Sequence, residues 1–189
     1  MPKYGEPESR SPLEALIASD RVPSDARPDL LTEEDIWLLL EDVKDPEIPA
    51  VSVVELGIVR DLSWDGKTLD IDVTPTYSGC PATELIEELI FEAMRMAGIR
   101  DIRLHRKLTP AWTTDWITEQ GREKLRKFGI APPEGSSSKM SLLGKSETIA
   151  CPHCGSEDTE RLSEFGSTAC KALYRCKDCR EPFDYFKCI

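Results

Sequence analysis

The sequence predicts an α+β protein in which a small mixed αββαβα domain precedes a C-terminal, β-rich metal ribbon. Three observations support this fold class. Helical and alternating apolar patterns succeed one another over residues 31–130, and a run rich in Pro, Gly and Ser follows at 132–138. Two Cys-x-x-Cys pairs then occupy the last quarter of the chain, as is typical of a ribbon that closes around one ion.

These patterns divide the chain into four parts. Prolines interrupt any periodicity near the start, and the run at 132–138 has too few apolar residues to form a core. We therefore expect a poorly structured N-terminal segment, an α+β domain, a flexible linker and a zinc-ribbon module at residues 1–30, 31–130, 131–147 and 148–189.

The first helix and the first two strands are predicted from capping and alternation. Thr32 is a good N-cap with three acidic residues after it, and this helix should end near Lys44, before a proline-rich turn. A strand is expected over residues 51–63, a hairpin turn at 64–67, and a second strand with alternating apolar residues at 69–73.

The second half of the domain is predicted to be helix, strand and helix. One apolar stripe at helical spacing comprises Ala82, Leu85, Ile86, Leu89, Ala93 and Ala97. Gly98 should end that helix, and a third strand is expected over residues 99–108. Thr113 or Thr114 should cap the last helix, which should end at Gly129.

The two cysteine pairs are the strongest chemical signal. Twenty-one residues separate the pair Cys151 and Cys154 from the pair Cys176 and Cys179, and two facing pairs place four thiolates around one tetrahedral ion. Zinc is the default ion, and a single iron is the alternative that the same ligands accept. Two disulfides in a secreted domain fit less well, because the polar start does not resemble a signal peptide and the seven cysteines are an odd number.

Cys80 is the candidate iron–sulfur or reactive cysteine of the first domain. It follows Gly79 and precedes Pro81, at or next to the expected start of a helix, where backbone amides and the helix dipole stabilise a thiolate. Such a cysteine can bind a metal, carry a cluster or react covalently. A small buried hydrophobic side chain is the alternative.

Cys170 and Cys188 remain once the four-thiolate site is assigned, and both are possible spare ligands. Cys170 lies in the expected hairpin turn of the ribbon, and Cys188 is the penultimate residue. The ends of a ribbon lie close together, so these two cysteines are candidates for a pair.

Signals for catalysis are weaker, and no catalytic residue is assigned. His153 lies inside a cysteine pair and His105 in a strand of mixed charge, so neither favours a Cys-His-Asp enzyme. Asp45 and Glu47 form a carboxylate pair beside prolines. A solvated turn explains this pair as well as an active site does.

The charge balance limits the classes of partner. Thirty-five acidic and 24 basic residues give a formal charge of −11, which argues against a general nucleic-acid binder. No apolar run approaches the roughly 20 residues that span a bilayer. We therefore expect a cytoplasmic protein whose partners are other proteins.

Several motifs of the first domain occur in a familiar order. They are Asp45-Pro46-Glu47-Ile48-Pro49, Val54-Glu55-Leu56-Gly57-Ile58-Val59, Thr74-Pro75-Thr76, Gly79-Cys80-Pro81, Trp112 and Gly129-Ile130. Over roughly residues 32–130 the chain resembles the small domain shared by cytosolic iron–sulfur targeting factors and a bacterial Suf-system accessory protein. The resemblance implies that Cys80 occupies the position of the family's cluster-handling cysteine.

The tail, over residues 165–176 and 181–188, resembles the D (also called J) subunits of bacterial phenylacetyl-CoA epoxidase systems. This resemblance implies an accessory role in phenylacetate catabolism, in which the protein helps to assemble or deliver an iron–sulfur cluster to the reductase subunit of the oxygenase. It also implies that the four paired cysteines are the metal ligands of the ribbon. A transient cluster on Cys80 needs further ligands, which a homodimer is one way to supply.

Two hypotheses of different classes follow. The first is a maturation factor whose partners are the oxygenase subunits, especially the iron–sulfur reductase. The second is a structural or electron-transfer subunit of the oxygenase itself, for which a rubredoxin-like iron in the ribbon would serve. A zinc-ribbon nucleic-acid binder is a third interpretation, and the acidic composition opposes it.

Overall fold

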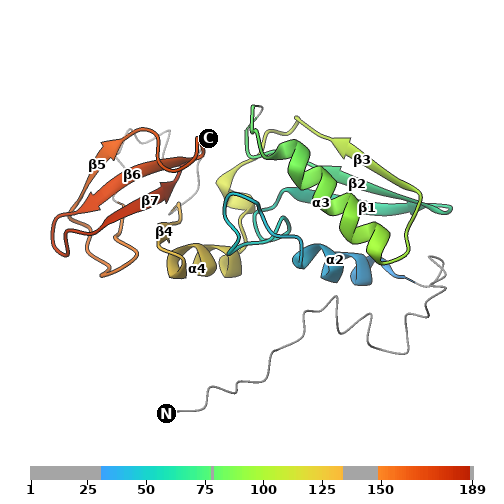
Figure 1. The fold of residues 1–189 in the computed structure, drawn as a ribbon, viewed down its shortest axis with the longest axis horizontal. Helices are drawn as coiled ribbons and strands as arrows, with labels where there is room; N and C mark the ends of the chain where they lie inside the picture. The colour runs from blue at the N-terminus through green and yellow to red at the C-terminus, as the bar shows by residue number, and fades with distance from the viewer. Residues whose placement is uncertain (1–30, 78, 134–148, 188–189) are drawn as a thin grey trace, which may run out of the picture.

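The computed structural model describes residues 31–77, 79–133 and 149–187, which form two units side by side along the longest axis (Figure 1). Helices and the sheet β1–β3 make the first unit, and the sheet β4–β7 makes the second. The predicted α+β class and αββαβα order are confirmed. The predicted N-terminal segment 1–30 and most of the predicted linker 131–147 lie outside the described residues.

Helix α2 (Glu33–Glu41) begins as predicted, with Thr32 as its N-cap. The Thr32 hydroxyl accepts the Asp35 N–H at 3.2 Å, and the Asp35 carboxylate accepts the Thr32 N–H at 2.9 Å. This reciprocal capping box satisfies two backbone donors that the first turn of a helix leaves free. The helix ends at Glu41, somewhat before the predicted end near Lys44.

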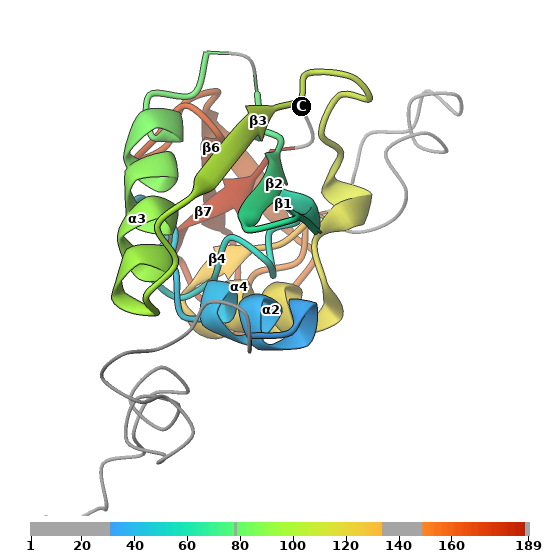
Figure 2. The same cartoon turned by 90° about the vertical axis from the view of Figure 1, so that its right-hand side faces the viewer.

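The first sheet has the order β1-β2-β3, with β1 (Val59–Asp65) antiparallel to β2 (Thr68–Val73) and β3 (Ile102–Arg106) parallel to β2. The predicted hairpin turn is confirmed, since Asp65 pairs with Thr68 and Gly66 adopts a φ of +63°. Strand β3 is shorter than the predicted span of 99–108. Figure 2 shows helix α3 covering one face of this sheet.

The strand predicted over residues 51–63 is wrong in its first half, which forms turns. The Ser52 N–H donates to the Glu55 carboxylate at 2.9 Å, and the Glu55 N–H donates to the Ser52 hydroxyl at 3.1 Å. This Ser-x-x-Glu exchange closes a turn where alternation of apolar residues suggested a strand. Gly57 follows with a φ of +66° and lies directly against Trp116.

Helix α3 (Thr83–Met96) follows the loop that carries Cys80. Its N-cap is Ala82, so both Cys80 and Pro81 precede the helix. The buried side chains of the helix are Ile86, Ile90 and Met94. Leu85, which the predicted stripe included, is 45 % exposed. The buried stripe is the i, i+4 row that begins at Ile86, and not the row that begins at Leu85. The helix ends before Gly98, as predicted.

The last helix begins later than predicted. Residues Thr114–Trp116 form a short 3-10 helix, η2, and the extended backbone of Ile117 separates it from α4 (Glu119–Lys127). Thr118, and not Thr113 or Thr114, caps α4 by accepting the Gly121 N–H at 3.0 Å. Gly129, at a φ of +87°, ends the helix as predicted.

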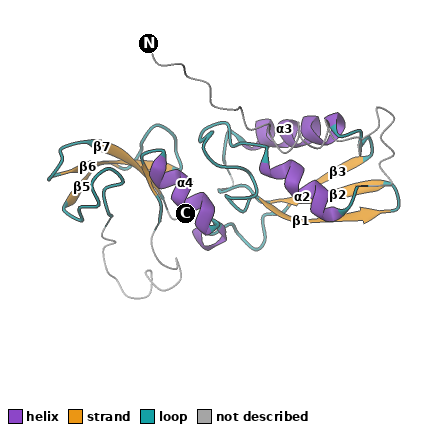
Figure 3. Ribbon diagram, turned by 90° about the horizontal axis from the view of Figure 1, so that it is seen from below, coloured by secondary structure: helices purple, strands orange, loops and turns teal. Residues whose placement is uncertain are grey.

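The ribbon sheet has the strand order β4-β7-β6-β5. Its members are β4 (Ile130–Ala131), β5 (Thr159–Ser163), β6 (Lys171–Cys176) and β7 (Pro182–Phe186). Strand β4 follows α4 directly and pairs in parallel with β7. Figure 3 shows α4 between the two units. The strand after it, β4, therefore joins the ribbon sheet although it directly follows a helix of the first unit. None of the described helices is long and apolar enough to cross a membrane.

Two glycines with similar backbone angles allow a matched test of packing. A Cβ at Gly57 would lie 2.7 Å from two atoms of Trp116, whereas a Cβ at Gly66 meets no atom within 4 Å. We expect Gly66→Ala to lower the free energy of unfolding by about 1 kcal/mol through backbone strain. Gly57→Ala should lower the free energy of unfolding by a further ~1–3 kcal/mol, because its added methyl group overpacks the contact with Trp116.

Urea denaturation followed by tryptophan fluorescence measures both losses in the first unit, where all four tryptophans lie. Equal losses for the two variants would show that the close approach of Gly57 to Trp116 contributes nothing.

Candidate metal centre and cysteine cleft

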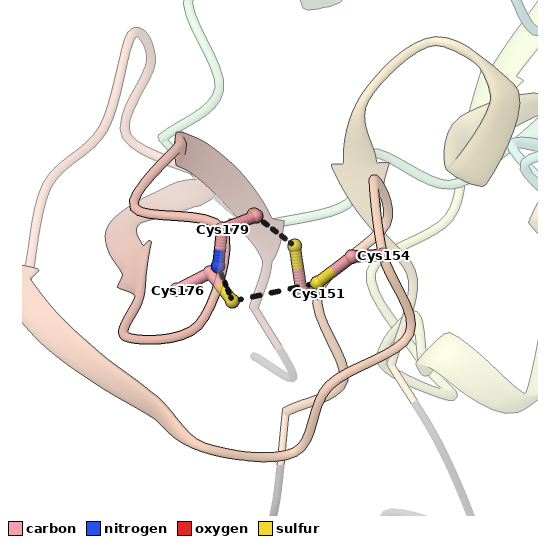
Figure 4. A group of neighbouring side chains, drawn as sticks. All are labelled: Cys151, Cys154, Cys176 and Cys179. Atoms are coloured by element: carbon pink, nitrogen blue, oxygen red, sulfur yellow. Dashed lines mark hydrogen bonds between the residues drawn. The ribbon is translucent and has the colours of Figure 1, made fainter.

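The four paired cysteines of the ribbon come together in space, as Figure 4 shows. Their sulfur atoms all lie within 4.8 Å of one another. The Sγ atoms of Cys151 and Cys179 are 3.7 Å apart, and those of Cys154 and Cys176 are 3.6 Å apart. Four thiolates at about 2.3 Å from a tetrahedral ion are separated by about 3.8 Å. The donor set therefore already has the spacing that one tetrahedral ion requires.

Both cysteine pairs sit on tight turns with left-handed backbone. Gly155 after the first pair has a φ of +76°, and Arg180 after the second pair has a φ of +66°. The Cys179 N–H donates to the Cys176 sulfur at 3.5 Å, and this hydrogen bond lowers the pKa of Cys176 to about 7. The second turn thus adopts the glycine-like geometry without a glycine, at a strain of about 1–3 kcal/mol.

Polar contacts align the two turns with each other. Lys177 reaches Asp158 twice, from its Nζ to the carboxylate at 2.7 Å and from its N–H to the carbonyl at 2.9 Å. The Ser156 hydroxyl donates to the Asp178 carboxylate. These contacts bring the two cysteine pairs face to face through protein groups alone.

A second candidate site lies where the ribbon meets the first unit, and we call it the cysteine cleft. It is lined by Asp45, Glu47, Thr76, Cys80 and Thr83 of the first unit and by Cys170 and Phe186 of the ribbon. The cleft contains about 460 Å³ free of protein atoms when its open mouth is included. The centre of a water molecule can occupy about 20 Å³ of this space, which is room for about one water molecule.

Cys80 is half-buried on the turn that precedes α3. Its N–H donates to the Tyr77 carbonyl at 3.1 Å, and its own carbonyl accepts the Thr83 hydroxyl at 2.9 Å. Burial raises the pKa of Tyr77, and the neighbouring Cys80 and Glu47 raise it further. Tyr77 and Cys80 pack against the same apolar core.

Cys170 faces Cys80 across the same cleft from the ribbon side. It is 5 % exposed, and its thiol donates to the Glu47 carboxylate with an Sγ to Oε2 distance of 3.7 Å. The Thr168 hydroxyl lies 3.0 Å from the same sulfur. Burial raises the pKa of Cys170 to about 11, so the free thiol is neutral at physiological pH. Cys188 lies outside the described residues.

The carboxylate pair that the sequence left open also belongs to the cleft. Asp45 is 7 % exposed and accepts the N–H groups of Glu47 at 2.9 Å and Ile48 at 2.8 Å. Burial raises the pKa of Asp45 against the effect of these two hydrogen bonds. A solvated turn does not describe a buried carboxyl. Pro46, between the two carboxylates, and Pro49 are the sequence signal for this rigid turn.

The weaker histidine candidates lie elsewhere. His105 is exposed on β3 and its Nε2 lies 2.7 Å from the Asp70 carboxylate. The ring of His153 is exposed and lies near Gly129. Sequence reasoning missed Tyr77 entirely, because its contribution depends on a neighbour in space and not on a motif.

Two protein families match the chain, one for each unit. Residues 33–103 match the family described as iron–sulfur cluster assembly protein, and residues 135–187 match the family described as PaaD zinc beta ribbon domain. The matched spans contain the cysteine cleft's Cys80 and the four clustered cysteines, respectively. The zinc-ribbon match therefore concerns the second unit, and the cluster-assembly match concerns the first.

Two curated relatives are similar to this chain. The chain is 52 % identical over 155 residues to an Escherichia coli K12 protein named as the putative D subunit of 1,2-phenylacetyl-CoA epoxidase, covering 82 % of this chain and 92 % of that protein. It is 33 % identical over 99 residues to a Porphyromonas gingivalis Fe-S protein maturation auxiliary factor, covering 51 % of this chain and 92 % of that protein.

A solved structure also covers the first unit. The crystal structure of a Bacillus anthracis domain of unknown function, DUF59, aligns with 49 % of this chain and 90 % of that chain. The TM-score is 0.46 and the sequence identity is 26 %.

Removal of one ribbon thiolate should release the ion and unfold the ribbon. We expect wild-type protein to hold one tetrahedral ion per chain and Cys176→Ser to hold less than about a tenth as much, because a structural site needs all four ligands. Elemental analysis gives the metal content, and hydrogen exchange should show lost protection in β5–β7 with α3 unchanged. Cys80→Ser is the matched control, and retention of the ion by Cys176→Ser would contradict the assignment.

The burial of Asp45 predicts a pH-dependent stability. A carboxyl whose pKa is raised by folding stabilises the folded state at low pH, and this contribution is lost as the pH rises through the folded value. Asp45→Asn keeps the oxygen that accepts both amides and removes the charge, so it should be more stable than wild type at pH 7.5, with a smaller advantage at pH 4.5. Urea denaturation at the two pH values measures this, and a variant that is less stable at both would contradict it.

Proposed function

This chain belongs to the family formed by the D subunits of 1,2-phenylacetyl-CoA epoxidase, and from that premise we propose that it is an accessory maturation factor of the phenylacetyl-CoA epoxidase. In this proposal the protein acts in the cytoplasm during phenylacetate catabolism. It assists the assembly of an iron–sulfur cluster, or its delivery to the reductase subunit of that multicomponent oxygenase. Its partners are the subunits of the complex.

One observation carries the proposal. Cys80, the only cysteine in the cluster-assembly match, lies half-buried in a cleft beside carboxylates, at the junction of the two units. A partly exposed cysteine in such a cleft can bind a thiophilic cargo and release it again, because its thiolate is reachable by an incoming ligand. The similarity to an Fe-S protein maturation auxiliary factor supports the same role for this unit.

The ribbon is proposed to hold zinc through its four clustered cysteines, Cys151, Cys154, Cys176 and Cys179. Zinc supplies folding free energy there and no electron transfer. The ribbon is too small to depend on apolar burial alone, so the ion stabilises the strands that place Cys170 and Phe186 against the first unit.

The cluster is cargo and not a resident cofactor in this proposal. One cysteine supplies one of the four ligands that such clusters usually take, so Cys80 needs further donors. They come from the same chain, from the client or from a second copy in a homodimer.

A structural or electron-transfer subunit of the oxygenase is the second candidate. The four-thiolate site supports this second candidate, because the same sulfur spacing accepts a single iron, and iron cycles between two oxidation states. Such a subunit would co-purify with the catalytic subunits in fixed stoichiometry, whereas a maturation factor leaves after its client is loaded.

Loss of the Cys80 thiol should abolish client loading without unfolding the protein. We expect Cys80→Ser to keep its zinc content and its melting curve, because serine has nearly the same size and the site is half-buried. Reductase co-expressed with this variant should carry less than about a tenth of the cluster that it carries with wild type. Iron and acid-labile sulfide in the purified reductase measure this. A fully loaded reductase would overturn the proposed function.

A further inference from the structure

We propose that the cysteine cleft is a composite iron–sulfur site, in which Cys170 of the ribbon and Glu47 of the first unit join Cys80 as ligands. This inference rests on the proposed cluster-handling role and assigns the additional donors to the same chain. It gives the ribbon a direct part in holding the cargo, besides its structural zinc.

The proximity of the three donors is the first argument. The Cys170 sulfur and the Glu47 carboxylate are already in contact, 3.7 Å apart, and Cys80 lines the same cleft. Cys80 packs against the apolar core that contains Cys170, which places the three donors around one cleft. These residues come from three separate segments of the chain, and docking of the ribbon brings them together.

The chemistry of the donors is the second argument. Two thiols and a carboxylate are ligands that iron accepts, and each thiol releases one proton when its sulfur binds. The buried Cys170 thiol contacts the half-buried Glu47 carboxylate at 3.7 Å, and such a polar pair contributes little more to stability than apolar side chains of the same size would. A thiol and a carboxylate placed together in a cleft are therefore candidates for a binding role.

The spacing of the donors favours a cluster over a single ion. Among the described residues, only the ribbon's four cysteines form a group of three or more such donors within 4.8 Å. The ligands of a two-iron cluster are divided between two metal atoms and lie further apart. Three ligands from this chain leave a fourth position, at which a client thiolate can attach and begin the transfer by ligand exchange, with no change in oxidation state.

The size of the cleft implies that loading moves the residues that line it. The cleft has room for about one water molecule, so binding of a cluster requires that the ribbon residues Cys170 and Phe186 move apart from the first unit. The contacts to be adjusted are the Cys170–Glu47 contact and the packing of Phe186 on Trp112, whose ring centroids are 5.9 Å apart.

The experiment is anaerobic reconstitution of the zinc-loaded, full-length protein with ferrous iron and sulfide. Iron, sulfide and the visible absorption spectrum are measured for wild type, Cys80→Ser, Cys170→Ser and Glu47→Gln. Thr168→Ala is the matched control, because Thr168 contacts the Cys170 sulfur without being a usual iron ligand. Zinc content and melting curves show whether each variant is folded.

We expect wild type and Thr168→Ala to bind about two iron and two sulfide per chain. Cys80→Ser and Cys170→Ser should each retain less than about a tenth of this, and Glu47→Gln should lose its cluster several-fold faster during gel filtration. If Cys170→Ser fails to fold, Glu47→Cys provides the second test. It should bind the cluster with a shifted spectrum, which only a residue in contact with iron can cause.

Two failures are distinguishable. Wild-type protein that takes up no iron beyond the ribbon would overturn the proposed cluster handling and this inference together. Clusters that depend on Cys80 but are unchanged in Cys170→Ser, Glu47→Gln and Glu47→Cys would overturn this inference alone and leave the proposed function standing.

Discussion

The packing of Phe186 into the first unit is the contact on which the rest of the arrangement depends. Its ring is 1 % exposed and belongs to the same apolar core as helices α2 and α3. It lies on Trp112, whose indole N–H donates to the Leu56 carbonyl at 2.9 Å. Leu56 and Phe186 both line the cysteine cleft, so the cleft exists because a residue near the C-terminus completes a core that begins near residue 36.

The metal centre and the cleft lie at opposite ends of the same two strands. Cys170 directly precedes β6 and Cys176 ends it, while β7 begins three residues after Cys179 and ends at Phe186. Six residues of extended chain span roughly 20 Å, so an ion at one end can hold the strands that position a thiol and an aromatic ring at the other. Loss of the ribbon ion should therefore loosen the pairing of β6 with β7 and displace the residues that these strands place in the cleft.

The features that followed from the sequence are those that depend on near neighbours. The capping box of α2, the hairpin between β1 and β2 and the two cysteine pairs each involve residues a few positions apart. The cleft did not follow, because Cys170 and Glu47 are 123 positions apart and no motif links them. The start of the last helix did not follow either, because η2, which carries Trp116 against Gly57, and the extended Ile117 come before α4, so that Thr118 caps this helix.

Strand β4 has a consequence for how the ribbon sheet can grow. It covers one edge of β7, the strand that carries Phe186, and is itself the outer strand of the sheet on that side. The opposite edge of this sheet is β5, where Glu160 pairs with Arg175 and Arg161 pairs with Glu164. Charged edge strands resist the addition of foreign strands. The two outer strands of the sheet are therefore β4, which has two residues, and the charged β5, and neither favours the addition of a strand from another chain.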